Sequence, residues 1–444
     1  MRIGFLLIGF GLGWAIAANA AEKTLHTFRK IRLTPEFWAE GAHVGDFNRD
    51  GKLDVAYGPF WFAGPDFQAR HEYRPATNSF TVKTPDGSEK TIPGYEGALG
   101  SKNAYSDCFF MWTGDFNGDD WTDILIAGIP GEQAWWFENP QDQSGHWKRH
   151  LALDVADNES PDFKDLTGDG KPELVCNSKG FFGFAAPDLT NPTAPWKFRP
   201  ITPNKNYHRF THGLGVGDVN GDERPDLLES NGWWEQPSSL AGDPEWTFHA
   251  YTFCPSDPGV PVGGAQLFAY DVNGDGWNDV ITCLAAHGYG LAWYEQTRDG
   301  GRISFQPHVF MNKQPADNKY GVKFTQPHAL DLVDMDGDGV KDLVTGKRFW
   351  AHGPDGDPEP NAPAVLYWFK LERGAGGVVD WVPYLIDNDS GVGTQVLARD
   401  VNGDGWPDIE VGNKKGAHVF LQELRKVSAQ EWEAAQPKPL ATAQ

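Results

Sequence analysis

The sequence contains little cysteine, few positive charges relative to negative ones, and no long apolar run after its first 20 residues. Its four cysteines form no C-x-x-C pair, which excludes a thiolate zinc site and thioredoxin-like chemistry and leaves any disulfide pairing open. The 38 Lys and Arg against 61 Asp and Glu give a formal net charge of −23, which excludes nucleic acid as a partner. No later apolar run reaches the roughly 18 residues of a spanning helix, so no membrane span is expected.

The N-terminal segment MRIGFLLIGFGLGWAIAANA has Arg2 as its only charge, followed by an apolar run. It ends in the small-x-small sequence Ala18-Asn19-Ala20, which is typical of a signal-peptidase site. We therefore expect residues 1–20 to be a signal peptide cleaved near Ala20, and the mature protein to be periplasmic or extracellular.

One acidic motif, D-x-[N/D/T]-x-D-[G/D/E]-x-x-[D/E], occurs seven times with start-to-start spacings of 69, 50, 53, 53, 63 and 66 residues. Oxygens at positions one, three, five and nine can converge on one hard cation, so each copy predicts a structural Ca²⁺ loop. Thr167 at position three and Asp120 and Glu223 at position six depart from the pattern. The predicted ligands are Asp46, Asn48, Asp50, Asp54, Asp115, Asn117, Asp119, Asp123, Asp165, Asp169, Glu173, Asp218, Asn220, Asp222, Asp226, Asp271, Asn273, Asp275, Asp279, Asp334, Asp336, Asp338, Asp342, Asp400, Asn402, Asp404 and Asp408.

The segments that flank the loops predict strands. Short runs rich in β-branched and apolar residues, such as DILIAG and DVITCL, follow the loops, which argues against the two helices of an EF-hand. Each unit has room for four strands, so the chain is predicted to be all-β, a seven-bladed β-propeller over residues 21–427. The N-terminal strand 24–33 is expected to complete blade seven, and residues 428–444 form a tail.

These loops between short strands resemble the FG-GAP/VCBS family of calcium-loop propellers, and the resemblance covers most of residues 24–424. It implies the propeller fold and a calcium ion in each blade. The family includes enzymes and adhesion modules, so the function has to be argued from other residues.

Polar residues are predicted to gather at the mouth of the central channel opposite the loops. Glu159, His212 and His328 each lie six residues before the first Asp of a loop, on the strand nearest the axis. His287 lies in a turn that returns to the same mouth. Three imidazoles and a carboxylate predict a Zn²⁺ or Mn²⁺ site with room for water or substrate. Other polar residues expected there are Glu40, Lys347, Arg348, His352 and Lys414.

Other histidines have a structural interpretation. His150, His249 and His308 share one position in the outermost strand, far from the axis, and are expected to be structural. His43 lies on the axial strand but only three residues before its loop, and both roles stay open for it.

His212, His287 and His328 also resemble positions in the propeller of the fungal aldos-2-ulose dehydratases, metal-dependent enzymes that eliminate water from keto-sugars. Elimination next to a carbonyl or uronate needs a Lewis acid and a base. The metal would be the Lewis acid, and a histidine, Glu159 or Lys347 would be the base. Arg348 would hold a hydroxyl or an anionic group, and Trp61 or Trp233 would stack on a sugar ring. The predicted function is a carbohydrate-active carbon–oxygen lyase. The alternative is a non-catalytic adhesion or glycan-binding module that uses the same funnel.

Overall fold

A computed structural model of the chain describes residues 22–97, 103–141, 143–255 and 263–441. The predicted signal peptide lies outside these residues. In the described residues the only helices are η1 (Pro315–Asp317) and α1 (Ala429–Ala435), so the chain is all-β as predicted. Neither helix has the length or apolar character to span a bilayer.

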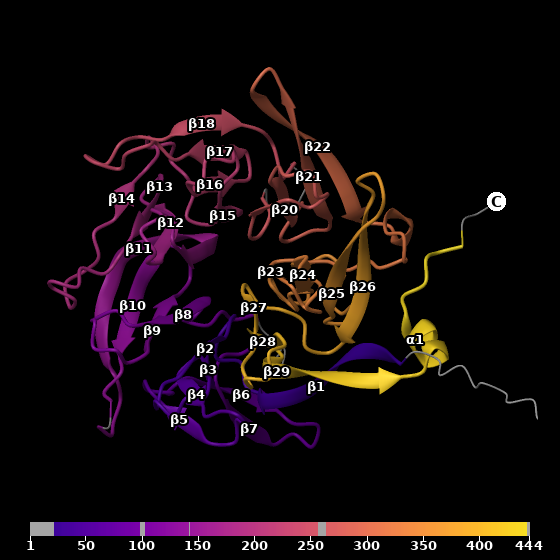
Figure 1. Cartoon of the computed structure of the whole chain (residues 1–444). Helices are drawn as coiled ribbons and strands as arrows, with labels where there is room; N and C mark the ends of the chain where they lie inside the picture. The colour runs from indigo at the N-terminus through magenta and orange to yellow at the C-terminus, as the bar shows by residue number, and fades with distance from the viewer. Residues whose placement is uncertain (1–21, 98–102, 142, 256–262, 442–444) are drawn as a thin grey trace, which may run out of the picture.

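Antiparallel sheets follow one another around a ring, with the polypeptide moving from sheet to sheet in chain order (Figure 1). One four-stranded sheet consists of β2 (His43–Gly45), β3 (Asp54–Tyr57), β4 (Phe60–Phe62) and β5 (Arg70–Glu72). Another consists of β15 (Leu214–Gly217), β16 (Asp226–Glu229), β17 (Gly232–Glu235) and β18 (Thr247–Ala250). The next consists of β19 (Phe268–Tyr270), β20 (Asp279–Cys283), β21 (Leu291–Asp299) and β22 (Arg302–Met311). The one after it consists of β23 (Leu330–Val333), β24 (Asp342–Gly346), β25 (Leu366–Arg373) and β26 (Val379–Asp387).

A seven-stranded sheet lies between the first and second of these. Its strands are β8 (Phe110–Gly114), β9 (Asp123–Ala127), β10 (Glu132–Glu138), β11 (Lys148–Lys164), β12 (Glu173–Ser178), β13 (Phe181–Ala185) and β14 (Arg199–Pro200). The 17-residue strand β11 pairs with β10 through its first half and with β12 through its second half. A single long strand therefore ends one set of four strands and begins the next.

The two ends of the described chain meet in one sheet. Its strands, from the outside inwards, are β1 (Lys23–Thr34), β29 (Gly416–Val427), β28 (Asp408–Asn413) and β27 (Val396–Arg399). β1 runs antiparallel to β29 from Lys23 opposite Val427 to Thr34 opposite Ala417, so the N-terminal strand covers an edge that would otherwise be open. A separate hairpin, β6 (Ser79–Lys83) and β7 (Glu89–Pro93), extends from the ring.

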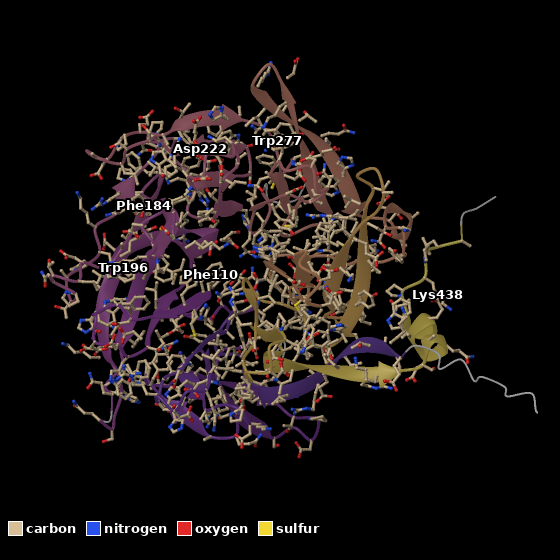
Figure 2. All side chains as sticks on the ribbon, viewed as in Figure 1. Phe110, Phe184, Trp196, Asp222, Trp277 and Lys438 are labelled. Carbon is tan, nitrogen blue, oxygen red and sulfur yellow. The ribbon has the colours of Figure 1, made fainter. Side chains whose placement is uncertain are left out.

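First strands of neighbouring sheets contact one another, as β2 does with β8 and β15 with β19. Second strands such as β9 and β20 are buried along their whole length, which explains their continuous apolar sequences. Aromatic rings fill the space between sheets: Phe110 and Trp196, labelled in Figure 2, belong to one buried cluster although they are far apart in the chain.

The acidic loops connect the first and second strands of the sheets. At position six, where most loops have glycine, the backbone is left-handed, with a φ of 89° at Gly276. Asp120 and Glu223 take the same conformation, with φ of 65° and 68°. The loop backbone is therefore kept where the glycine is missing, at the steric cost of a side chain in the left-handed region.

Candidate metal centre

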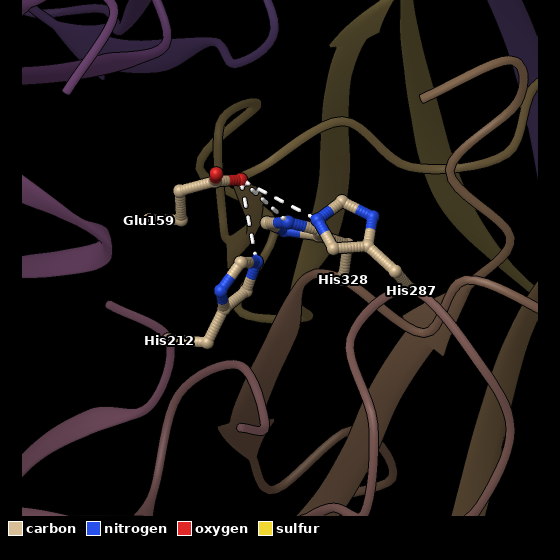
Figure 3. Close-up of side chains that lie close together, drawn as sticks. All are labelled: Glu159, His212, His287 and His328. Atoms are coloured by element: carbon tan, nitrogen blue, oxygen red, sulfur yellow. Dashed lines mark hydrogen bonds and ion pairs between the residues drawn. The ribbon is translucent and has the colours of Figure 1, made fainter. Parts of the chain in front are cut away.

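Glu159, His212, His287 and His328 converge on one another (Figure 3). Glu159 is on β11, and the histidines are in the segments just before β15, between β20 and β21, and just before β23. The Nε2 atoms of His212, His287 and His328 lie 3.4, 3.6 and 3.2 Å from Glu159 Oε2. Four side chains that the sequence places on separate strands and turns thus offer ligand atoms that all lie within 4.8 Å of one another.

Hydrogen bonds orient two of the imidazoles. His212 Nδ1 lies 2.9 Å from the carbonyl oxygen of Phe210, and His287 Nδ1 lies 3.1 Å from Gln326 Oε1. Because an oxygen of this kind only accepts, each Nδ1 carries the proton, and a neutral ring then has its lone pair on Nε2. Both lone pairs point toward Glu159, as in metal-binding histidines whose other nitrogen is held by a second hydrogen bond.

The charge states of the group follow from its burial. Burial lowers the pKa of His287 to about 4 and that of His328 well below 6.5, with the nearby Arg348 adding to the effect on His328. Burial acts to raise the pKa of Glu159, but its contacts with the three imidazoles outweigh this and hold the pKa well below its ordinary range. Neutral His287 and His328 beside an ionised Glu159 are in the protonation states that a metal ion requires of its ligands.

Close backbone packing fixes this geometry. A Cβ atom on Gly263, whose φ is 118°, would lie 2.5 Å from His212 Cβ, so only glycine fits beside that histidine. The backbone of Gln326 bonds to two neighbouring segments. Its N–H donates to the Gly288 carbonyl, and its carbonyl accepts from the N–H of Arg348. The turn that carries His287 is therefore bonded to the segment that precedes His328.

Arg348 and Glu40 form a buried ion pair beside the cluster. Arg348 Nε donates to Glu40 Oε2 at 3.1 Å, and its Nη1 lies 3.8 Å from Glu159 Oε2. Glu40 and Glu159 raise the pKa of the guanidinium against the opposing effect of burial. Arg348 is thus held as a cation next to the four converging side chains.

A pocket of about 580 Å³ opens onto the cluster. Its described lining combines aromatic and apolar side chains with polar ones: Tyr105, Phe109, Ile129, Glu159, His208, Arg209, Phe210, His212, His287, Arg348 and His352. The His352 ring centre lies 4.2 Å from that of His287, and its Nδ1 lies 3.2 Å from Asp357 Oδ1. An imidazole outside the cluster, supported by a carboxylate, therefore faces the same space.

Several predicted residues lie elsewhere. The ammonium of Lys347 contacts the Thr325 hydroxyl, and Lys347 is absent from the described pocket lining; burial lowers its pKa to about 8. Trp61 and Trp233 stack on His71 and on His249, so their faces are covered within their own sheets. Rings that sequence reasoning did not single out, Tyr105 and Phe210 among them, line the pocket instead.

The histidines of the outer strands share one arrangement. His150, His249 and His308 each stack on a tryptophan of the neighbouring strand, with ring centres 4.1 to 4.3 Å apart. Each Nε2 lies 2.7 or 2.8 Å from a glutamate two residues beyond that tryptophan. These contacts hold each ring against its own sheet, and none of the three histidines is in the described pocket lining. His43 contacts the Thr113 hydroxyl and the Val44 carbonyl instead of the cluster.

The carboxylates of the acidic loops divide into two kinds. Those at positions one and five are turned into the loop, where Asp271 accepts from backbone N–H groups of residues 274 to 276. The aspartates at position nine are buried and bond to one backbone N–H at the start of the loop and one beyond it: Asp226 accepts from Val219 at 2.8 Å and from Gln236, just after β17, at 2.9 Å. Position nine therefore joins the loop to the strand beyond it, a role that the motif alone did not reveal.

Residues 115–176 and 271–345 match the model of the FG-GAP-like repeat. The chain contains FG-GAP-like repeats. Each matched segment begins at the first Asp of a predicted loop, Asp115 or Asp271, which confirms the predicted resemblance to FG-GAP repeats. The comparison with curated proteins gives no match.

Three solved structures with some likeness to this chain share little sequence with it. An Agrocybe aegerita lectin that recognises non-reducing terminal N-acetylglucosamine is 15% identical, with 93% of this chain and 82% of the lectin covered and a TM-score of 0.30. An auxiliary nutrient binding protein from Bacteroides ovatus is 9% identical, with coverage of 77% and 82% and a TM-score of 0.41. The exotype rhamnogalacturonan lyase YesX is 13% identical, with coverage of 89% and 72% and a TM-score of 0.41. At these TM-scores the likenesses carry no functional argument.

Proposed function

We propose that the chain is a secreted, calcium-stabilised β-propeller that acts on carbohydrate as a metal-dependent carbon–oxygen lyase. The observation that carries the proposal is the convergence of three imidazole Nε2 atoms on one carboxylate oxygen. Without a cation, the lone pairs of His212 and His287 would face an ionised carboxylate, and within the described residues His212 Nε2 has no hydrogen-bond partner. A metal ion removes this repulsion.

The spacing of the donors favours Zn²⁺. Four ligands at about 2.0 Å from a tetrahedral zinc ion lie about 3.3 Å from one another. The three distances from Nε2 to Glu159 Oε2, 3.2 to 3.6 Å, lie near this edge length, and those of His212 and His287 are longer than an ordinary hydrogen bond. Three nitrogen donors also suit zinc better than manganese, which prefers oxygen. Mn²⁺ is the competing ion in the test.

The pocket suits the chemistry of elimination. A bound divalent metal would stabilise negative charge on a substrate carbonyl oxygen and so acidify the adjacent carbon. Tyr105, Phe109 and Phe210 supply aromatic surface for the apolar part of a sugar, and the polar lining can bond its hydroxyls. His352 is placed to accept the proton, because Asp357 holds its Nδ1 and leaves Nε2 available.

The finer features of the fold belong to the same proposal. We count seven four-stranded blades, because the two halves of β11 belong to different sets of four strands. A calcium ion in each loop would offset part of the charge of their 24 carboxylates. Carboxylates of the loops at Asp165 and Asp334 already lie within 4.8 Å of one another in groups of three. In the Asp334 loop, the ammonium of Lys370 contacts two of these carboxylates, and a bound calcium ion would replace this contact.

The proposal is tested by measuring the metal content of the protein and its activity together. Purified protein should hold about one equivalent of zinc besides calcium, and it should generate absorbance between about 230 and 270 nm from keto-sugars or uronate glycans. Zinc without any elimination would favour the glycan-binding alternative. Calcium alone, unchanged by His212→Ala and His328→Ala, would contradict the metal centre itself.

A further inference from the structure

The guanidinium of Arg348, in the wall of the pocket, has one nitrogen without a hydrogen-bond acceptor in the described residues. Only 2% of the residue is exposed, its Nε bonds to Glu40, and its Nη1 lies 3.8 Å from Glu159 Oε2. Within the described residues, Nη2 is buried and finds no acceptor. A buried charged donor without a partner is costly, and Arg348 lines the pocket, so a ligand can supply the missing acceptor.

The charges around the metal centre favour an anion. Glu40 and Glu159 face Arg348, Lys414 lies near Glu40 and Asp357, and Lys347 lies near Asp357 as well. A divalent metal held by Glu159 and the three histidines would add two positive charges to this group of three carboxylates and three cations, and so give it an excess positive charge. A buried excess charge is unfavourable until an ion of opposite sign enters.

The described lining of the pocket has more arginines than carboxylates, in a chain whose formal net charge is −23. Arg348 and Arg209 line it, and Glu159 is the sole carboxylate in its described lining. Arg348 lies at the buried end beside the cluster, with its guanidinium carbon 5.6 Å from the Phe109 ring centre, whereas Arg209 is exposed at the rim. The buried guanidinium is therefore the one placed to bind a group next to the reacting carbon.

We propose that the ligand is a sugar that carries one carboxylate, a uronate, and that Arg348 Nη2 binds this carboxylate beside the metal. The inference rests on the proposed function, since the metal supplies the excess positive charge. One free guanidinium nitrogen suits one carboxylate oxygen, and a sugar phosphate is the competing anion in the test. In the elimination, a base takes the proton α to the carboxylate, the freed electron pair forms the carbon–carbon double bond, and the β oxygen leaves and takes up a proton as alcohol or water.

The test compares the methyl glycosides of glucuronate, of its methyl ester and of glucose, together with glucose 6-phosphate, by calorimetric titration of zinc-loaded protein. The uronate should bind about 10- to 100-fold more tightly than the ester and glucose, the range for a lost charge-assisted hydrogen bond. R348K keeps a positive charge beside Glu40 but loses the planar fork, and should reduce this preference to a few-fold while the zinc content stays unchanged.

R209Q is the matched control. It should weaken uronate binding only by about threefold or less, and added salt should remove that difference, because Arg209 is at the exposed rim. Equal affinity for uronate and ester, an unchanged preference in R348K, or tighter binding of glucose 6-phosphate would overturn the inference while leaving the metal centre intact. Absence of both zinc and manganese would instead refute the proposed function. If R348K does not fold, the comparison of acid and ester on the unchanged protein still decides.

Discussion

Replacing His212 by alanine should abolish most of the stability that zinc gives to the protein. His212 supplies one of four converging donors, and its ring is buried. With calcium in excess throughout, zinc at about 1,000 times its dissociation constant stabilises the folded state by about 4.1 kcal/mol. If the loss of one ligand weakens binding by about 1,000-fold, the same zinc concentration leaves only about 0.4 kcal/mol.

The size of the expected change can be stated in degrees. An unfolding entropy of about 2.1 cal/mol/K per residue over about 420 residues gives about 0.9 kcal/mol for each degree near the midpoint. Zinc should therefore raise the Tm of the unchanged protein by about 5 °C and that of His212→Ala by less than about 1 °C. The assay is thermal melting followed by circular dichroism, with and without zinc.

His150→Ala provides the control for losing a buried ring. His150 is buried, stacks on Trp136 and contacts Glu138, so the substitution should lower the Tm both with and without zinc. Its zinc-dependent increment should equal that of the unchanged protein. An equal increment in His212→Ala, or a reduced one in His150→Ala, would refute the assignment of His212 as a ligand.

Three further predictions concern the loops and the pocket. Asp226→Ala should lower the free energy of unfolding by about 2 kcal/mol or more even in the presence of chelator, because it leaves two backbone N–H groups without an acceptor. Asp222→Ala should lose only the stability that bound calcium adds. Similar calcium-dependent losses in both variants would contradict the division of roles. Burial raises the pKa of Asp123 to about 8 and that of Asp226 to about 7, above the unfolded values. In the chelated protein, the stability that these two carboxyls contribute should therefore be greatest below about pH 4. The Tm should fall as the pH rises from about 5 to 8 unless calcium is added, and a Tm that rises over this range would contradict the prediction. His352→Gln should lower kcat by about 100-fold or more with zinc content unchanged, and an unaffected kcat would exclude its role as base.

The repeat pattern made much of the fold predictable. Second strands are buried on both faces and therefore have continuous apolar sequences, and each follows an acidic loop, so strands could be located without a template. The closing strand followed from the missing outer strand in the last unit. The 17-residue strand β11 was not predictable, because the turn expected between two units is absent and the chain simply continues.

The cluster was predictable because residues at the same number of positions before each repeated loop lie at the same level along the propeller axis. Glu159, His212 and His328 share that offset, and the structure brings them together. Lys347 and Arg348 are adjacent in an extended segment, where successive side chains point in opposite directions, so only one of them could face the pocket. Gln326 and Asp357 belong to irregular segments without periodicity, and no sequence signal connected them to His287 and His352.

The claim on which the account depends is that one transition-metal ion lies between the three imidazoles and Glu159. Anomalous diffraction from crystals of the protein, measured on both sides of the zinc absorption edge, tests this most directly. The account predicts one strong zinc peak about 2.0 to 2.1 Å from the Nε2 atoms of His212, His287 and His328. Featureless density at that point, in crystals grown with zinc and with calcium present in the loops, would contradict it.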